Sequence, residues 1–232
     1  MIQRQIIAIG DNGFRKDPSI HGLNRFILSR TQKPQPRICV IPTASGDQES
    51  YVDDFFKVFQ SYDCRLSQLS LFRGETEHIE DLILSQDILY ITGGNTRNLL
   101  TLWKDWGVDH FIRKAYENGT VLAGGSAGSL CWFSEGITDS IPGRFSALKC
   151  LGFLKESNCP HYDEEGRRPS YHHHILMGDV PSGYAAENGV ALHFIDEQFV
   201  EAVSAYSEKN AYFVERRNGS PKEMKIPARK LT

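Results

Sequence analysis

Short runs rich in isoleucine and valine recur along the first part of the chain, separated by segments with helical periodicity. Most of these runs are typical of buried strands. They are QIIAIG at 5–10, RICVIPTAS at 37–45, RLSQLSLF at 65–72, DILYITGG at 87–94 and TVLAGG at 120–125. Strands that alternate with helices predict a mostly parallel sheet with helices on both faces. Functional sites form at the carboxyl ends of such strands.

Two segments between these runs are predicted to be helical. From residue 51 to 62, aromatic residues and valines recur at spacings of three and four, which places them on one face of a helix. A second helical stretch begins near Thr96, breaks at Gly107 and ends at Asn118-Gly119. A glycine at each of these ends is a normal helix stop.

The chain after residue 133 is less regular. Residues 134–185 predict a loop-rich middle, and antiparallel strands are predicted around HFIDEQFVEAVS at 193–204 and NAYFVERRNG at 210–219. The polar tail after Gly219 is predicted to fray. Because no repeat, linker or shift in composition divides the chain, we expect one α/β domain over residues 1–232.

Composition and charge narrow the class of protein. The chain has 26 basic and 29 acidic residues, a net charge of −3, and no run of lysine or arginine that would bind nucleic acid. The N-terminal MIQRQIIAIG lacks the apolar stretch of a signal peptide or membrane span, so we expect a cytoplasmic protein without a membrane partner. Five widely spaced cysteines without a CxxC pair favour buried, reduced thiols over disulfides or a thiolate zinc site.

The stretch TVLAGGSAGSLCWF contains the pattern G-x-S-x-G over Gly124–Gly128, after a predicted strand and before a short helix. In that context the pattern predicts a sharp turn that presents the hydroxyl of Ser126, with small residues clearing the space around it. The amide of Ala127 would then face an oxyanion. The alternatives are a glycine-rich turn in which Ser126 caps the helix, and a phosphate site, which is disfavoured because no lysine follows the glycines.

A second glycine turn, Thr92–Thr96, closes the preceding predicted strand. In a parallel sheet its loop emerges at the same edge as Ser126, so the amide of Gly94 is a candidate second oxyanion donor. The alternative is an ordinary turn in which Asn95 or Thr96 caps the following helix.

A serine nucleophile needs a base, and two of the histidine contexts are candidates. His161 follows a proline in Cys159-Pro160-His161, which restricts its backbone and suits a base that must stay oriented. The cluster His172–His174 suggests a metal site as an alternative. In an extended chain His172 and His174 would point to one side and could share a face with His161. No HExxH or paired-ligand helix accompanies the cluster, so we expect neither a metal nor another cofactor.

The acidic partner of the histidine is left open by the residues alone. Asp139 follows the predicted turn of Ser126, and its carboxylate could hold the imidazole in one tautomer. Glu135 and Asp163 are competitors for that role.

Taken together, these segments resemble the peptidase E family, the serine dipeptidases also called dipeptidase E or aspartyl dipeptidases. The resemblance rests on four segments in the same order and spacing between roughly residues 80 and 162: Gly93–Thr96, Gly125–Gly128, an aspartate in the next loop, and Pro160–Tyr162. It implies a fold similar to class I glutamine amidotransferase domains, a three-layer α/β/α sandwich with a mostly parallel central sheet. It also implies the site roles: Ser126 as nucleophile, His161 as general base, Asp139 as orienting acid, and Gly94 and Ala127 as oxyanion donors.

One segment departs from the family. Members that cleave after an N-terminal aspartate carry Gly-Glu-Thr-Arg downstream of the histidine, whereas this chain reads DEEGRRPSYH at 163–172. Arg167 or Arg168 could bind a substrate carboxylate in its place, or lie in solvent as loop charges. Asn95, Arg167 and Arg168 are the candidate substrate-binding residues, and strict specificity for Asp-Xaa dipeptides is not expected.

The resemblance therefore implies a serine peptidase that hydrolyses short peptides through an acyl-enzyme, and we expect a cytoplasmic monomer or homodimer. One alternative is a hydrolase of isopeptides or other small acyl substrates that uses the same serine. Another is a non-catalytic binding or metal-binding domain on the same fold.

Overall fold

The computed structural model describes residues 2–11, 21–74 and 76–232. Its strands are β1 (Gln5–Ile9), β2 (Arg37–Ile41), β3 (Arg65–Gln68), β4 (Ile88–Ile91), β5 (Val121–Gly125), β6 (Phe133–Thr138), β7 (Ser146–Lys149), β8 (Leu154–Cys159), β9 (Gly183–Ala186), β10 (Val190–Ile195), β11 (Gln198–Ser204), β12 (Asn210–Arg217), β13 (Ser220–Pro227) and β14 (Arg229–Lys230). Its helices are α1 (His21–Leu28), α2 (Glu49–Phe59), α3 (Ile79–Leu84), α4 (Thr96–Trp106), α5 (Val108–Glu117), α6 (Ala127–Leu130) and α7 (Arg167–Met177), with 3₁₀ turns η2 (Ser29–Thr31) and η3 (Thr43–Ser45).

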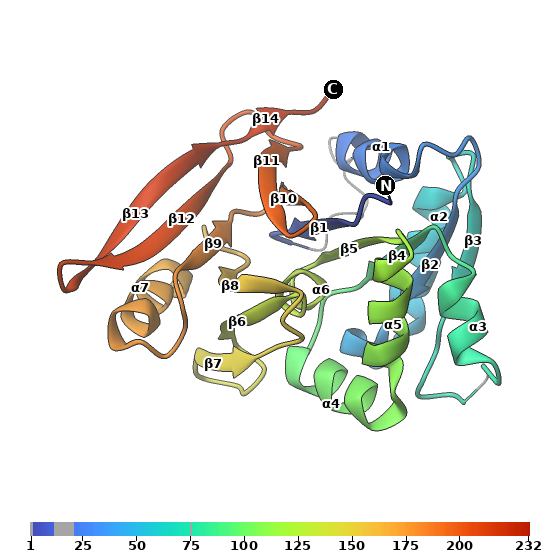
Figure 1. The fold of residues 1–232 in the computed structure, drawn as a ribbon, viewed down its shortest axis with the longest axis horizontal. Coiled ribbons are helices and arrows are strands. Elements are labelled where there is room, and N and C mark those ends of the chain that lie inside the picture. The colour runs from blue at the N-terminus through green and yellow to red at the C-terminus, as the bar shows by residue number, and fades with distance from the viewer. Residues whose placement is uncertain (1, 12–20, 75) are drawn as a thin grey trace.

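The main sheet has the strand order β14-β11-β10-β1-β5-β4-β2-β3. The five strands from β1 to β3 in this order are parallel, while β10 and β11 extend the sheet by antiparallel pairing. The strands β1, β5 and β4 are neighbours and point the same way (Figure 1). Their carboxyl ends therefore lie side by side at one edge of the sheet.

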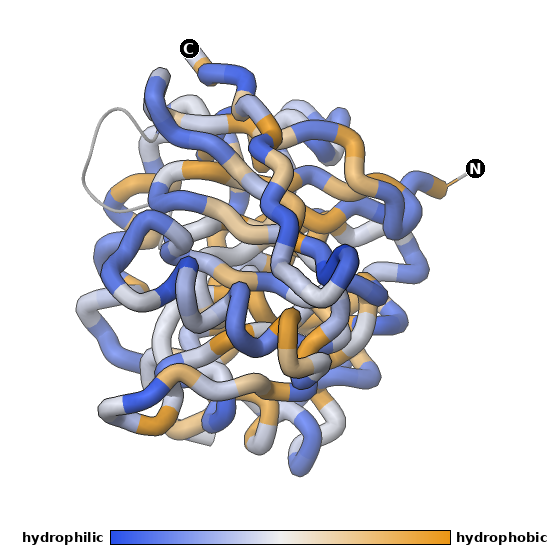
Figure 2. Tube along the Cα trace, turned by 90° about the vertical axis from the view of Figure 1, so that its left-hand side faces the viewer, coloured by the Kyte–Doolittle hydropathy of each residue, from blue (hydrophilic) through white to orange (hydrophobic). Residues whose placement is uncertain are grey.

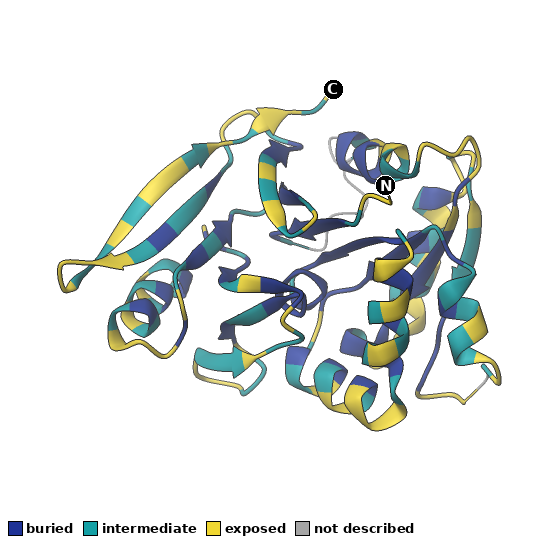
Figure 3. Cartoon of the chain, in the orientation of Figure 1, coloured by how far each residue is buried: buried dark blue, intermediate teal, exposed yellow. Residues whose placement is uncertain are grey.

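Helices cover both faces of the main sheet, as the alternation of its side chains requires. On β1, Ile7 and Ile9 face a cluster that contains α1 and α2 residues such as Phe26 and Phe55. Ile6 and Ala8 face the other cluster, which includes residues of α3, α4 and α5. Figure 3 shows the central strands buried between these layers. The three-layer α/β/α sandwich and the mostly parallel sheet are thus confirmed.

The predicted helical segments are also present. The face predicted from residue 51 to 62 lies in α2 as far as Phe59, with Tyr62 in the turn beyond the helix, and the stretch from Thr96 divides at Gly107 into α4 and α5. Gly107 adopts a positive φ of 71° at the end of α4, which explains the division, because a glycine enters this conformation without a Cβ penalty.

The prediction of a loop-rich middle over residues 134–185 is wrong. This region contains strands β7, β8 and β9, most of β6, and helix α7. These strands form much of a second sheet, whose order is β13-β12-β9-β8-β6-β7. Helix α7 packs against this sheet through buried residues such as Tyr171 and Ile175. Its strands are short and only partly buried, so they lack the continuous apolar runs that mark the main sheet.

The prediction of a fraying tail after Gly219 is wrong too. Residues 220–227 form β13, which pairs with β12 in antiparallel register from Asn210 opposite Pro227 to Arg217 opposite Ser220. In Figure 2, where this hairpin faces the viewer, hydrophilic residues occupy much of it, and Met224 and Ile226 are the only large aliphatic residues of β13. Backbone hydrogen bonding to β12 orders a segment whose hydropathy alone does not predict a strand.

The five cysteines form no disulfide with one another; Cys39, Cys131 and Cys159 are buried, as expected, whereas Cys64 and Cys150 are only partly buried. Burial raises the pKa of Cys39 and of Cys159 to about 12. Among the described residues, no helix has the length and apolar character needed to span a membrane.

Stability is expected to fall in mild acid because of His193 on β10. Its side chain is 2% exposed, and its Nε2 lies 2.9 Å from Gln5 Oε1. Burial, assisted by the charge of Arg30, lowers the pKa of His193 to about 4. The unfolded chain, with an ordinary histidine pKa of about 6.5, binds the proton first as the pH falls. The free energy of unfolding should therefore decrease between about pH 6.5 and pH 4, by about 3 kcal/mol in total.

Urea unfolding at pH 7 and at pH 4.5 measures this loss. The His193→Gln variant should lose clearly less stability over this interval than the wild type. The control is His110→Gln, because His110 is exposed on α5 and should leave the pH dependence unchanged. An equal loss in wild type and His193→Gln would contradict the assignment of this proton to His193.

Candidate active site

Ser126 lies on the sharp turn between β5 and α6, at the carboxyl edge of the main sheet. Its backbone has φ 55° and ψ −110°, a conformation that a residue with a side chain rarely adopts. The turn is held by a hydrogen bond from the Ser126 amide to Ile9 O of β1, at 3.1 Å. The side chain of Ser126 makes no capping bond to α6, so the helix-cap alternative does not describe it.

Gly124 and Gly128 make room for this turn against the neighbouring strand β4. A Cβ added to Gly128 would lie 2.2 Å from Ile91 O, and one added to Gly124 would lie 2.7 Å from the same oxygen. Both distances are much shorter than van der Waals contact. The turn can approach β4 this closely only because Gly124 of β5 and Gly128 of α6 have no side chain. The small residues around Ser126 are required by the packing of the turn.

His161 lies opposite Ser126 in the turn that follows β8. Its amide donates to Gly10 O, at the end of β1, over 2.9 Å, and its own φ is 55°. The ring Nε2 lies 2.9 Å from Ser126 Oγ. Two residues that were predicted separately from the sequence are therefore within hydrogen-bond distance, in the geometry of a nucleophile and its base.

The other ring nitrogen of His161 contacts two residues that were not predicted from the sequence. Nδ1 lies 2.7 Å from Asn188 Oδ1 and 3.0 Å from Glu164 Oε1. The amide of Asn188 also donates through Nδ2 to Glu164 Oε1 over 3.2 Å. The sequence carries a signal for Glu164, because a carboxylate three residues after the histidine lies in the same turn. Asn188 is 27 residues away in the chain and carries no local signal.

Asp139, expected as the orienting acid, does not contact His161. Its side chain is 61% exposed, and its carboxylate accepts a hydrogen bond from Arg167 over 2.8 Å. It lies in the connection after β6, where Arg167 of α7 reaches it. The prediction that Asp139 orients the histidine is therefore corrected: Nδ1 is already occupied by other oxygens.

The two competing acids also lie elsewhere. Glu135 is within β6 and pairs with Lys149 of β7 across the second sheet. Asp163 forms an ion pair with Lys209 and accepts a hydrogen bond from the backbone N–H of Asn188. Partial burial would raise the pKa of Asp163, but these hydrogen bonds outweigh it and lower the pKa.

The glycine turn after β4 lies at the same edge as Ser126. Gly94 is exposed, has φ 142°, and would place an added Cβ 2.1 Å from Ala44 O. The next amide, of Asn95, donates to this same Ala44 O over 2.7 Å, which fixes the turn. Within the described part of the chain, neither the Gly94 amide nor the Ala127 amide has a hydrogen-bond acceptor. Both are free to bind a ligand oxygen.

The three candidate substrate-binding side chains already have partners within the protein. Asn95 Oδ1 caps α4 by accepting from Asn98 N over 3.0 Å, and its Nδ2 donates to Ser140 O. Arg167 is buried and bound to Asp139. Arg168 lies 4.8 Å from the ring centres of Tyr162 and Tyr212 and 3.4 Å from a carboxylate oxygen of Glu223.

The histidine cluster is helical, not extended, so the expected sharing of a face with His161 is wrong. His172 Nε2 contacts Tyr162 Oη and Glu223 Oε2, at 3.0 and 3.1 Å, whereas His174 pairs with Asp179. Over residues 2–11, 21–74 and 76–232, no group of three or more potential ligands is placed to hold a metal ion.

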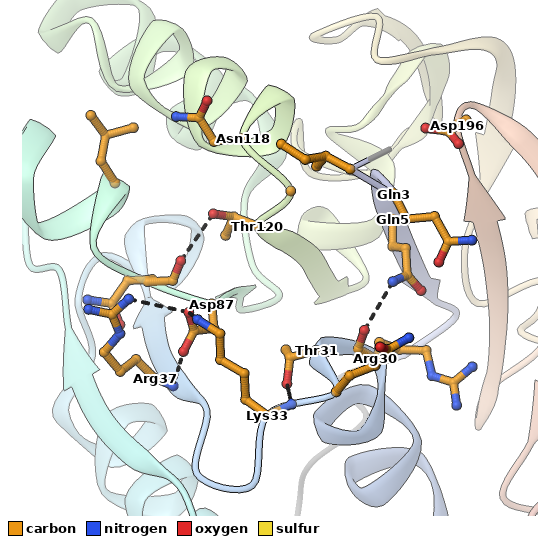
Figure 4. Close-up of a pocket in the computed structure, with 15 residues that line it drawn as sticks. Gln3, Gln5, Arg30, Thr31, Lys33, Arg37, Asp87, Asn118, Thr120 and Asp196 are labelled. Atoms are coloured by element: carbon orange, nitrogen blue, oxygen red, sulfur yellow. Dashed lines mark hydrogen bonds and ion pairs between the residues drawn. The ribbon is translucent and has the colours of Figure 1, made fainter.

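A cavity of about 680 Å³ opens at the opposite edge of the main sheet, near the amino ends of β1, β2 and β5. Figure 4 shows that several of its polar side chains are bonded within the protein. Asp87 binds Lys33 and Arg37, Gln5 donates to Arg30 O, and Thr120 donates to the backbone of the loop before β4. The cavity is separate from Ser126 and His161.

Comparisons with known proteins place the chain in a family and a fold. The model of peptidase family S51 matches residues 6–202. The chain is 48% identical over 229 residues to the uncharacterized peptidase YgaJ of Bacillus subtilis strain 168, covering 98% of this chain and 99% of that protein. A peptidase from an acI-B1 actinobacterium has a similar structure, with a TM-score of 0.74 at 13% identity over 98% of this chain and 96% of that one. A protein assigned as a peptidase E from Listeria monocytogenes EGD-e has a TM-score of 0.64 at 19% identity, over 87% and 98%.

Proposed function

The chain belongs to peptidase family S51, and from this premise we propose that it hydrolyses short peptides with Ser126 as nucleophile and His161 as general base. Membership of the family makes the protein a serine-type peptidase and favours an enzyme over a binding domain. The observation that carries the residue assignment is the 2.9 Å contact between Ser126 Oγ and His161 Nε2, on a strained turn. A glycine at position 126 would remove the strain of this backbone conformation, and strained residues that are kept in place are typical of functional sites.

The reaction begins when Ser126 Oγ attacks the scissile carbonyl carbon and His161 Nε2 takes the hydroxyl proton. The resulting imidazolium then gives this proton to the leaving amine, which breaks the peptide bond and leaves an acyl group on Ser126. Water attacks the acyl-enzyme with His161 again as base, which releases the acid product and restores the serine.

The amides of Gly94 and Ala127 are the proposed oxyanion donors. Both are free of internal acceptors among the described residues, and both belong to turns at the carboxyl edge of the sheet. Each turn is held by a backbone hydrogen bond, from Asn95 to Ala44 O in one and from Ser126 to Ile9 O in the other. Donors that are fixed before the reaction stabilise the developing charge without reorganisation.

Short peptides are the proposed substrates, without a strict requirement for aspartate. Arg167 and Arg168, the available replacements for the arginine of the family's Gly-Glu-Thr-Arg segment, are bound by Asp139 and Glu223. A guanidinium already paired with a carboxylate gains less from a second one, because the first must be displaced or its charge shared.

A library of dipeptides and tripeptides, including Asp-Xaa and β-aspartyl members, tests the proposal when products are identified by mass spectrometry. We expect cleavage of several α-linked dipeptides, with Asp-Xaa members not uniquely favoured. Reaction with a small organophosphate should add one phosphoryl group to the tryptic peptide that contains Ser126. Cleavage of β-aspartyl members alone would identify an isopeptidase, and labelling at another serine would overturn the assignment of the nucleophile.

A further inference from the structure

The Nδ1 side of His161 presents an unusual pair of oxygens for a serine peptidase site. The closer oxygen belongs to the neutral amide of Asn188, at 2.7 Å, and the carboxylate of Glu164 lies slightly farther, at 3.0 Å. We infer that Asn188 is the positioning residue that orients His161. Glu164 acts mainly by holding the side-chain amide of Asn188 in one orientation. This inference rests on the proposed function of His161 as the base.

The contacts of Asn188 define which way its amide points. Its Nδ2 donates to Glu164 Oε1, and a carboxylate can only accept. Oδ1 therefore faces His161, since the reversed amide would place an oxygen against the carboxylate and an NH₂ group against the ring. Without Glu164, the amide of Asn188 would be free to take either orientation.

The amide orientation in turn selects the tautomer of the ring. Because Asn188 Oδ1 can only accept, Nδ1 of His161 carries the proton. Nε2 is then unprotonated and can accept the proton of Ser126, 2.9 Å away. An unlocked asparagine that donated to Nδ1 would favour the opposite tautomer, which cannot serve as the base.

The exposure of Glu164 limits what its charge can contribute at His161. The side chain of His161 is 15% exposed, whereas that of Glu164 is 49% exposed, so water screens its charge. The backbone N–H of Asn188 donates to Asp163 Oδ1 over 2.9 Å, and this hydrogen bond holds the backbone in place. Asp163 is in turn paired with Lys209. The site is built to fix the position of Asn188, while the charge of Glu164 contributes little.

Three variants separate orientation from charge. Asn188→Ala removes the acceptor and should lower kcat about tenfold with little change in KM, since it acts on the base and not on binding. Glu164→Gln should cost less, about threefold, because the introduced side-chain amide can still accept from Asn188 through its own oxygen. The double variant N188D/E164Q exchanges amide and carboxylate at constant charge. It should retain activity and move the acidic limb of the kcat/KM profile upward by about one pH unit, because the carboxylate then bonds directly to the imidazolium.

Glu165→Gln is the matched control, since Glu165 is exposed beside Glu164, and it should leave both kcat and the pH profile unchanged. Thermal unfolding of each variant checks that the fold is retained. An unchanged kcat in Asn188→Ala, or an unmoved acidic limb in N188D/E164Q, would overturn the inference. The rate of organophosphate labelling of Ser126 distinguishes the two levels of failure. If the wild type is not labelled at Ser126, the proposed function fails; if it is labelled and the Asn188 variants react at the wild-type rate, only the role of Asn188 fails.

Discussion

Replacing Ser126 with alanine is expected to lower kcat for peptide hydrolysis by roughly 10³-fold or more. The substitution removes the atom that forms the acyl-enzyme, and His161 cannot supply an equivalent nucleophile at the same position. The fold should be retained, because alanine has the same backbone preference as serine at φ 55°. Initial rates on the best substrate of the library, with the melting temperature of each protein, measure both effects.

Ser126→Gly extends this prediction to the strain of the turn. Glycine adopts a positive φ without a Cβ penalty, so this variant should be equally inactive but more stable than the wild type by about 1 kcal/mol. Ser61→Ala, at an exposed serine after α2, controls for the loss of a hydroxyl. Near-normal turnover by Ser126→Ala would show that another residue forms the acyl-enzyme.

Replacing Gly94 with alanine is expected to lower kcat about 10²-fold. The added Cβ would lie 2.1 Å from Ala44 O, and φ is 142°, so the turn must move away from η3. Movement of this turn carries the Gly94 amide away from its proposed position as an oxyanion donor. Steady-state kinetics should show most of the loss in kcat, since the oxyanion exists only in the transition state and the intermediates that flank it.

Gly107→Ala is the matched control for Gly94→Ala. Gly107 also has a positive φ, 71°, but an added Cβ there meets no atom within 4 Å. It should therefore cost about 1 kcal/mol of stability through backbone strain, with kcat unchanged. If the kcat of Gly94→Ala falls no further than that of Gly107→Ala, Gly94 does not supply an oxyanion donor.

Much of the main sheet and one half of the candidate site were predictable from the sequence. Strands β1, β2, β4 and β5 are continuous apolar runs because both of their faces are buried, and this leaves a clear pattern. The elbow at Ser126 was predictable because its requirements are local: a preceding strand, a following helix, and glycines where the backbone contacts Ile91 O. The residues alone left His161 as one of two candidate bases, and the family resemblance selected it; its contact with Ser126 is present in the structure.

Apart from β12, which lies in the predicted strand segment 210–219, the second sheet was not predictable in the same way. Its strands carry mixed polar and apolar residues, and β13 acquires its order from pairing with β12. A short segment of this composition is equally compatible with a loop or a strand until a neighbour supplies the hydrogen bonds. The helix α7 was missed for a related reason: it contains Pro169 and three histidines, and only a few of its residues are buried.

The sequence by itself determined the doubly covered sheet, the turn that presents Ser126 and the glycine turn at Gly94, because each depends on residues adjacent in the chain. The tertiary structure decided which groups surround His161. It placed Asn188 and Glu164 at Nδ1 and directed Asp139 to Arg167 instead. The partner of a buried side chain is chosen by the packing of distant segments, here the turns after β8 and β9 and the start of α7. Short-range patterns of hydrophobicity and turn residues carry no record of those distances.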